Sequence, residues 1–304
     1  MFHAMHKHVL DSANKFPAVT IGSDMEFFCK KEGLIVISQG LIPGSKHEPV
    51  TLAEGILMHR DNCLGEFTIN PSQNHKEFLA NCFASYDRVQ EVCDSIGVRP
   101  YFNSFHMFDV ADLIHPECMQ FGCEPDFSAF TGAANMSPDP WSIGTGRSAG
   151  GHIHIGYDNP TKELNCAIVQ LMDLFVGSLF TCELEGGQSR SRRALYGAAS
   201  CMRHKPYGVE YRTPGPEWFG YLLGNKNKST RIVEYITAAA RISVAMAKKG
   251  FVLNTIPKHK NLAAIVVKTI NAYGVDEYMV DGKHHAGHLE HFFDSVGGLE
   301  AYAA

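Results

Sequence analysis

Two histidines stand two residues apart between glycines in the segment GGHIHIG, residues 150–156. Side chains alternate between the two faces of a β-strand, so His152 and His154 would share one face and the intervening isoleucines the other. An imidazole can bind a metal ion or move a proton near neutral pH. The spacing therefore predicts a strand with one apolar face and one face that can do chemistry.

Three other segments show the same division into an apolar and an ionisable face. They are SDMEFF (23–28), GEFTIN (65–70) and GVEYRT (208–213). Their ionisable faces carry Asp24 and Glu26, then Glu66, then Glu210 with Arg212. An ordinary half-exposed sheet also alternates, but it mixes lysine, serine and threonine into the polar face, and lysine is absent from these four faces.

Carboxylates gathered on one surface repel each other unless cations neutralise them. Oxygen ligands with an occasional imidazole suit Mg²⁺ or Mn²⁺, whereas Zn²⁺ usually recruits more histidine or cysteine. The four strands therefore predict a carboxylate-lined hollow that holds a metal ion. The histidines would face this hollow and the isoleucines would pack against helices.

The arginines of the sequence indicate which reaction a metal site of this kind could serve. Arg190, Arg192 and Arg193 lie in a Gly/Ser-rich segment, and Arg203 and Arg212 flank the glutamate strand. The planar guanidinium suits phosphate and carboxylate oxygens. Metal ions and arginines beside carboxylates are what phosphoryl transfer from a nucleotide requires, although the 190–193 run also fits a solvated surface loop.

The elements that must position these groups are mainly strands, with a few helices. Helices are expected at 76–96, with a stop at Gly97, and at 162–186 and 229–249, from apolar residues recurring every three or four positions. Strands are expected at residues 18–30, 34–42, 50–58, 63–70, 98–102, 149–157 and 208–213. The loop-rich stretch 105–147 is expected near the active site, because long loops in compact domains are usually functional.

The length allows one large domain or two small ones, and because no interdomain linker is evident we expect a single catalytic domain over residues 1–304. The chain is 45% hydrophobic and 19% charged, with a net charge of −5, which argues against an extended nucleic-acid surface. Polar residues interrupt its most apolar run, 166–182, so no membrane role is expected. Nine cysteines without a C-x-x-C pair favour a reduced, cytoplasmic protein.

A set of motifs between residues 20 and 220 resembles a known family. The set, in order, is GSDMEFF, LGEFTINPS, GGHIHIG, RRALYG and PYGVEYRTPGPEW. It resembles the carboxylate–amine ligases of the glutamine synthetase and glutamate–cysteine ligase superfamily, and most of all the phage-associated branch called COOH–NH2 ligase type 2.

The resemblance implies an α+β fold. A curved, mainly antiparallel sheet, shaped as a saddle or half-barrel, would carry helices on its convex face and the active site on its concave face. It also implies that ATP and Mg²⁺, or Mn²⁺, serve amide-bond formation through an acyl phosphate. The expected partners are a small-molecule or peptide carboxylate and an amine, in the cytoplasm of a bacterial host if the protein is phage-encoded. A homo-oligomer is possible within this superfamily.

The resemblance also implies metal ligands. Glu26, Glu66 and Glu210 match the positions expected to hold metal. One of His152 and His154 should bind metal or nucleotide phosphate. Asp24 stands where a glutamate is common, which leaves its ligand role less secure.

Catalytic and nucleotide-binding roles follow from the same resemblance. Arg212 should stabilise the transferring phosphoryl group, and Arg193 a phosphate or the substrate carboxylate. Glu210 is also expected to be a catalytic residue. Gly150 and Gly151 should let the backbone approach the nucleotide. The list of expected nucleotide contacts is completed by His152, His154, Arg190 and Arg203.

Two other functions fit the same residues. One is a phosphotransferase resembling the guanidino kinases, which share the superfamily's catalytic fold. The other is a metal-dependent hydrolase that uses His152 and His154 on a bound metal and needs no ATP.

The loop-rich stretch 105–147 contains acidic residues in the segment Cys123-Glu124-Pro125-Asp126-Phe127. For a ligase, these acids are candidates for positioning or deprotonating the amine.

Overall fold

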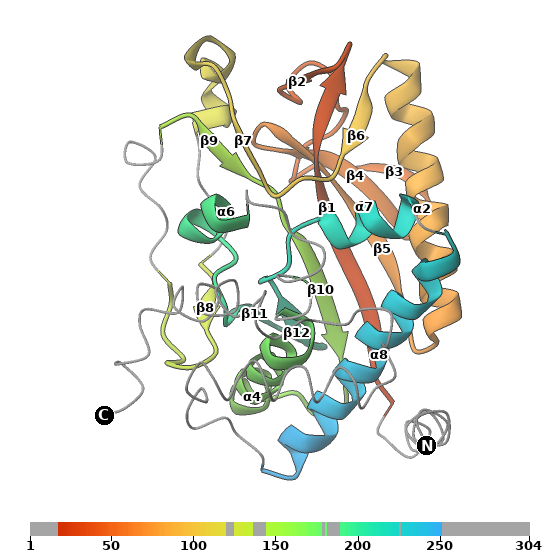
Figure 1. Ribbon diagram of the computed structural model, residues 1–304, viewed down its shortest axis with the longest axis vertical. Coiled ribbons are helices and arrows are strands. Elements are labelled where there is room, and N and C mark those ends of the chain that lie inside the picture. The colour runs from red at the N-terminus through yellow and green to blue at the C-terminus, as the bar shows by residue number, and fades with distance from the viewer. Residues whose placement is uncertain are drawn as a thin grey trace, which may run out of the picture.

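A computed structural model defines most of the chain (Figure 1). The structure describes residues 18–119, 125–135, 144–177, 180, 189–224 and 226–250. Expectations for Cys123, Glu124 and the tail from 251 lie outside these residues.

One open sheet organises the described residues, and all of its strand pairs are antiparallel. Its main path runs β3-β4-β5-β1-β10-β12-β11-β8, and β2 and β6 both pair with β1. The strands are β1 (Thr20–Lys31), β2 (Leu34–Val36), β3 (Val50–Ala53), β4 (Ile56–Asp61), β5 (Leu64–Ser72), β6 (Arg99–Tyr101), β8 (Phe127–Ser128), β10 (Gly151–Gly156), β11 (Cys201–Lys205) and β12 (Gly208–Tyr211). A second sheet pairs β7 (Phe105–Met107) with β9 (Gly146–Ser148).

The helices give the molecule its α+β class, as predicted. They are α2 (His75–Ser95), α4 (Lys162–Met172), α6 (Ser189–Leu195), α7 (Glu217–Gly224) and α8 (Lys226–Lys248), with two short 3₁₀ turns, η1 (Val110–Leu113) and η2 (Pro116–Met119), and a π turn, η3 (Asp173–Gly177). None of the described helices is long and apolar enough to span a membrane.

The apolar face of the sheet supplies the core. Phe27, Ile153, Ile155 and Tyr211 all have no exposed surface. They join one hydrophobic cluster with residues of α2, α4 and α8, such as Ile168. Burying these side chains provides the main driving force for folding, and it fixes which face of each strand is left for the polar residues.

Cross-strand register brings the polar residues together. On β1, Glu26 lies opposite Glu66 of β5, and Asp24 lies opposite His152 of β10. His154 in turn lies opposite Glu210 of β12. Directly opposite side chains on one face of a sheet lie within contact distance, so four segments far apart in sequence converge on one surface.

Helix α2 shows why the periodic pattern was readable. Asn74 caps it by accepting a hydrogen bond from the Lys76 backbone N–H at 2.8 Å. Phe78 and Val89 are among the buried residues of its apolar stripe. After Ile96 the chain turns at Gly97 with a φ of 70°, which glycine adopts readily.

Several elements differ from the sequence expectation. The run 50–58 is divided by a turn at Gly55, which has a φ of 71°, so it forms the hairpin β3-β4. The strand expected at 34–42 ends at Val36. The helix expected at 162–186 is regular only to Met172 and continues as the π turn η3. Strand β11 was not expected, because its sequence CMRHK shows no alternation.

Candidate functional site

A cluster of three carboxylates lies at the centre of the polar face. Glu26 of β1, Glu66 of β5 and Asp61 of β4 each offer an oxygen, and the three ligand atoms lie within 4.8 Å of one another. Glu26 and Glu66 were predicted from their strands. Asp61 was missed because it precedes Asn62, whose φ of 53° marks a tight turn, and the pair reads as turn residues.

The protonation of this carboxylate cluster reflects its crowding. Burial, and then the charges of Glu66 and Asp61, raise the pKa of Glu26 to about 8. The charge of Arg212 and a hydrogen bond from the Gly150 backbone N–H, at 2.6 Å, act in the opposite direction. Burial also raises the pKa of Glu66. These oxygens need a nearby positive charge to ionise together, and an all-oxygen set of this kind suits Mg²⁺ or Mn²⁺.

His59 of β4 supports Glu66 from the neighbouring strand. Its Nε2 lies 3.1 Å from Glu66 Oε2. Burial alone would lower the pKa of His59, but the hydrogen bond and charge of Glu66 outweigh it and raise the pKa. A histidine in this place can orient a ligating carboxylate and offset part of its charge.

Glu210, on β12, lies among positively charged side chains, whereas Glu26 lies among carboxylates. Its carboxylate forms ion pairs with Arg212, with Lys205 at 2.9 Å and with Arg203 at 3.5 Å. Burial opposes ionisation, but the charges of Arg212 and Arg203 hold the pKa of Glu210 well below its ordinary value. Glu210 is therefore a fixed negative charge that orients cations.

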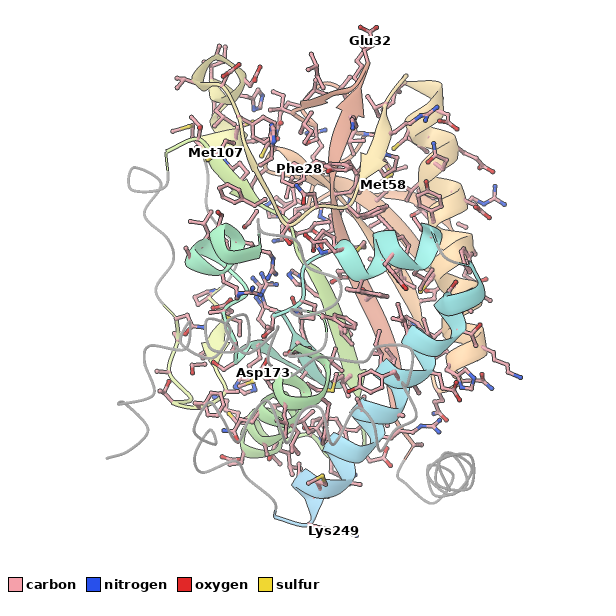
Figure 2. All side chains as sticks on the ribbon, viewed as in Figure 1. Phe28, Glu32, Met58, Met107, Asp173 and Lys249 are labelled. Atoms are coloured by element: carbon pink, nitrogen blue, oxygen red, sulfur yellow. The ribbon has the colours of Figure 1, made fainter. Side chains whose placement is uncertain are left out.

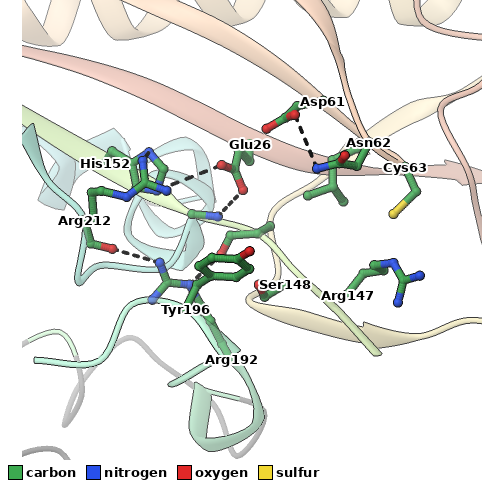
Figure 3. A pocket seen from close by; sticks show the side chains of 13 residues that line it. Glu26, Asp61, Asn62, Cys63, Arg147, Ser148, His152, Arg192, Tyr196 and Arg212 are labelled. Atoms are coloured by element: carbon green, nitrogen blue, oxygen red, sulfur yellow. Dashed lines mark hydrogen bonds and ion pairs between the residues drawn. The ribbon is translucent and has the colours of Figure 1, made fainter. Parts of the chain in front are cut away.

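His152 lies between the two regions. Its Nε2 is 3.9 Å from Glu26 Oε1, and its Nδ1 is 3.4 Å from Glu210 Oε1. Burial and the nearby Arg212 charge lower its pKa well below the usual value, so the imidazole is neutral. A neutral imidazole has a lone pair available to a metal ion. Figure 3 shows His152 on one side of Glu26 and Asp61 on the other.

Arg212 also contacts the loop-rich stretch 105–147. Asp126 Oδ2 lies 3.7 Å from Arg212 Nε, and Asp126 Oδ1 accepts a hydrogen bond from Asn135 at 2.9 Å. The described part of this stretch thus brings an acidic residue to the arginine, next to the pocket that holds Glu26.

His154 belongs to a separate group on the same face. Its Nε2 lies 3.0 Å from Asp24 Oδ2, while its Nδ1 hydrogen-bonds to the Tyr207 hydroxyl and its ring stacks on that tyrosine. Burial acts to lower the pKa of His154, but the charge of Asp24 raises it. Asp24, His154 and Tyr207 line a pocket of about 380 Å³ whose other walls include Thr68.

The remaining predicted residues take different places. Arg193 is buried on α6. Arg192 donates hydrogen bonds to the backbone carbonyls of Ala149 at 2.7 Å and Thr213 at 2.6 Å, so its guanidinium fastens the ends of β10 and β12. The side chain of Arg190 lies outside the described residues.

Packing alone requires the two glycines that precede His152. A Cβ on Gly150 would collide with the His152 ring, and one on Gly151 would collide with the carbonyl oxygen of Gly215. Gly151 also accepts a hydrogen bond from the Trp218 indole at 3.0 Å. The expected role of these glycines beside a nucleotide stays a prediction.

Part of the chain is similar to a known protein family. Residues 143–245, about a third of the chain, match the family described as Phage phiEco32-like COOH.NH2 ligase-type 2. The matched segment contains β10, β12 and α6. The match confirms, over this part of the chain, the resemblance predicted from the sequence motifs, and it supports the predicted class of an amide-forming ligase.

Solved structures also show likenesses, and no curated protein sequence matches. A novel glutamine synthase homolog aligns at 12% identity with a TM-score of 0.42, over 99% of this chain and 70% of that one. A bifunctional glutathione synthetase from Pasteurella multocida aligns at 10% identity with a TM-score of 0.43, over 99% of this chain and 50% of that chain. A GmaS/ADP complex aligns at 12% identity with a TM-score of 0.37, over 99% of this chain and 73% of that chain. This chain thus spans half the length of the glutathione synthetase.

Proposed function

We propose that the protein is an ATP- and Mg²⁺-dependent carboxylate–amine ligase. A carboxylate oxygen of one substrate attacks the γ-phosphorus of ATP, which gives an acyl phosphate and ADP. The nitrogen of an amine then attacks the acyl carbon, inorganic phosphate leaves, and the nitrogen loses a proton to give the amide. The observation that carries this proposal is the carboxylate cluster of Glu26, Glu66 and Asp61, of which Glu26 and Asp61 line one pocket with Arg212.

The carboxylate cluster fits a divalent cation. Its oxygens are mutually close, and burial together with its own charges keeps the pKa of Glu26 at about 8. Glu26, Glu66 and Asp61 would hold the ion, with the neutral His152 imidazole beside them. When bound, Mg²⁺ would offset the charge of the phosphate oxygens.

Arg212 is assigned to the transferring phosphoryl group. Glu210 holds its guanidinium from one side, and the carbonyl oxygen of Cys201 accepts the Arg212 backbone N–H at 2.9 Å. A guanidinium fixed in this way is already oriented when charge develops on the phosphoryl oxygens. Arg203 and Arg193 remain proposed contacts of phosphate or of the substrate carboxylate.

The pocket beside His154 is assigned to the nucleoside part of ATP. Its volume of about 380 Å³ lies within the range of small-molecule sites, and Tyr207 is 43% exposed at its wall. An exposed aromatic ring can stack on a base. His154 and Asp24 would then lie near the ribose or phosphates.

The substrates are proposed only as classes: a small-molecule or peptide carboxylate and an amine. Asp126, at Arg212, is the described acidic residue best placed to attract a protonated amine. We further propose that the reaction takes place in bacterial cytoplasm, where ATP and Mg²⁺ are abundant.

Product analysis tests the proposal. Purified protein is incubated with ATP, Mg²⁺ and pooled acids and amines, and phosphate release and new masses are measured. A ligase releases one phosphate for each amide, only when an acid and an amine are both present. Arg212→Ala is the negative control. A phosphorylated amine without free phosphate would indicate a phosphotransferase instead.

The different partners of the two histidines argue against the hypothesis of a metal-dependent hydrolase that uses both on one metal ion. His152 lies between Glu26 and Glu210, whereas His154 is engaged by Asp24 and Tyr207. The two imidazoles therefore belong to different groups and do not face a common point. Substrate turnover without ATP would revive the hydrolase reading.

A further inference from the structure

A buried carboxylate lies on the opposite face of the sheet from the carboxylate cluster. Asp173 begins the π turn η3, directly after α4 ends, and has no exposed surface (Figure 2). Isolated π turns inside helices occur frequently at functional sites. Neither the metal nor the nucleotide assignment uses this residue.

Asp173 joins two strands that carry the proposed reaction. Its Oδ1 accepts a hydrogen bond from the Tyr211 hydroxyl at 2.7 Å, and its Oδ2 accepts one from the Ser200 backbone N–H at 2.6 Å. Tyr211 is the last residue of β12 and stands between Glu210 and Arg212, so its side chain points to the helix side of the sheet while theirs point to the polar face.

Ser200 extends this connection to the neighbouring strand. Its φ of 76° lies in the left-handed region, which is uncommon for a residue other than glycine. The hydrogen bond to Asp173 stabilises that conformation. Cys201, the next residue, begins β11, and its carbonyl oxygen accepts the backbone N–H of Arg212.

Asp173 supplies two acceptor oxygens, which a neutral side chain of its size does not. Burial raises its pKa to about 7, and hydrogen bonds from Tyr211, Ser200 and Thr213 partly oppose that shift. A carboxylate accepts from two donors at once, whereas an asparagine amide accepts through one atom only. Burial of an acid here is unfavourable, but its carboxylate accepts hydrogen bonds from both donors.

We propose that Asp173 is a positioning residue for this enzyme: acting through Tyr211 and Ser200, it fixes Glu210 and Arg212 in the orientation that phosphoryl transfer requires. The inference rests on the ligase function proposed above. Displacement of a reacting group by about 1 Å can lower the rate a hundredfold, so support from behind the strand bears directly on kcat.

The test removes one hydroxyl that never touches the pocket. Tyr211→Phe is compared with Tyr157→Phe, because the buried Tyr157 hydroxyl also donates a single hydrogen bond, to Asn165 Oδ1 at 2.6 Å. Both variants should lose similar thermal stability. Only Tyr211→Phe should lower kcat, by about tenfold, with the KM for ATP changed less than about twofold, since orientation of Arg212 is lost and nucleotide binding is kept.

A double-mutant cycle shows whether Asp173 acts through Tyr211. Asp173→Asn should lower kcat to a similar extent, and the double variant with Tyr211→Phe should be clearly less impaired than the product of the two effects. Independent effects would overturn the inference, as would equal kcat values for Tyr211→Phe and Tyr157→Phe. A wild-type protein without ATP-dependent turnover would overturn the ligase function, and this inference with it.

Discussion

Glu26 and Glu210 are the same residue type, are both buried, and stand on the same face of one sheet, yet their neighbours give them opposite properties. Beside Glu26 lie two more carboxylates, and the pKa of Glu26 rises to about 8, first through burial. Around Glu210 lie Arg212, Arg203 and Lys205, and its pKa falls well below the ordinary value in spite of burial. Burial is common to both residues, so the surrounding charges decide the direction of the shift.

This difference divides the site by charge. The region of Glu26 has an excess of acid and would gain stability from an added cation. In the described part of the chain, the region of Glu210 contains three protein cations, Arg212, Arg203 and Lys205, around one carboxylate, and this excess of positive charge favours an anion. A nucleotide with its metal ion requires one region of each kind, and His152 stands where the two regions meet.

The largest expected effect comes from removing the guanidinium. Arg212→Ala should lower ATP-dependent turnover by about a thousandfold, the scale of an arginine that stabilises a transferring phosphoryl group. Phosphate release under saturating ATP measures it. Arg88→Ala is a suitable control, because Arg88 is exposed on α2 and pairs with Glu91 one turn away. Full activity of Arg212→Ala would refute its assigned role.

The next effect tests the division between the two acids. Glu26→Gln should weaken Mn²⁺ binding by about a hundredfold, since it removes one oxygen ligand and its charge. Glu210→Gln should change Mn²⁺ affinity far less and should mainly lower turnover, because Arg212 loses its partner. Titration followed by the paramagnetic resonance of free Mn²⁺ measures both. If the two variants lose affinity equally, Glu210 is itself a ligand and the division is wrong.

The strand faces were predictable from sequence because the apolar half of each strand is fully buried. Ile153 and Ile155 had to face the core, and this fixed His152 and His154 on the other side. Strand β11 could not be read in this way, because Cys201 and Met202 are adjacent and both buried, without alternation. Its position depends on pairing with β12, which is a tertiary effect.

The site was predictable in its residue types and much less so in its grouping. Alternation placed Asp24 and Glu26 on one face, but it could not assign them to different groups. The pairing register of the strands determines this grouping, because Glu26 lies opposite Glu66 of β5 while Asp24 lies opposite β10 and contacts His154. Asp61 was hidden because a residue at the end of a strand can serve equally as a turn residue.

His59 allows a smaller test of the acidic region. Its imidazole lies 3.1 Å from Glu66, whose carboxylate favours the protonated form of His59, and a bound metal ion would offset the same negative charge of Glu66. His59→Ala should therefore lower Tm by roughly 6 °C in EDTA and by about half as much in excess Mg²⁺. Scanning calorimetry under both conditions measures it, with the exposed His47→Ala as control. Equal losses with and without Mg²⁺ would show that His59 does not serve the metal-binding region.

The smallest expected effect is the pH dependence of stability without metal. The pKa of Glu26 is raised in the folded protein, so between its ordinary value of 4.5 and about 8 the folded state holds a proton that the unfolded state has lost. Stability of the metal-free protein should therefore fall as pH rises through this window. Glu210 has the opposite shift, so its contribution is lost only as pH falls below the window. Between pH 5.5 and 8 in EDTA, Tm should fall by roughly 4 °C in the wild type and in Glu210→Gln, and distinctly less in Glu26→Gln. A wild-type slope retained in Glu26→Gln would mean that another group carries the proton. The cause of the opposite shifts would then have to be sought outside the carboxylate cluster.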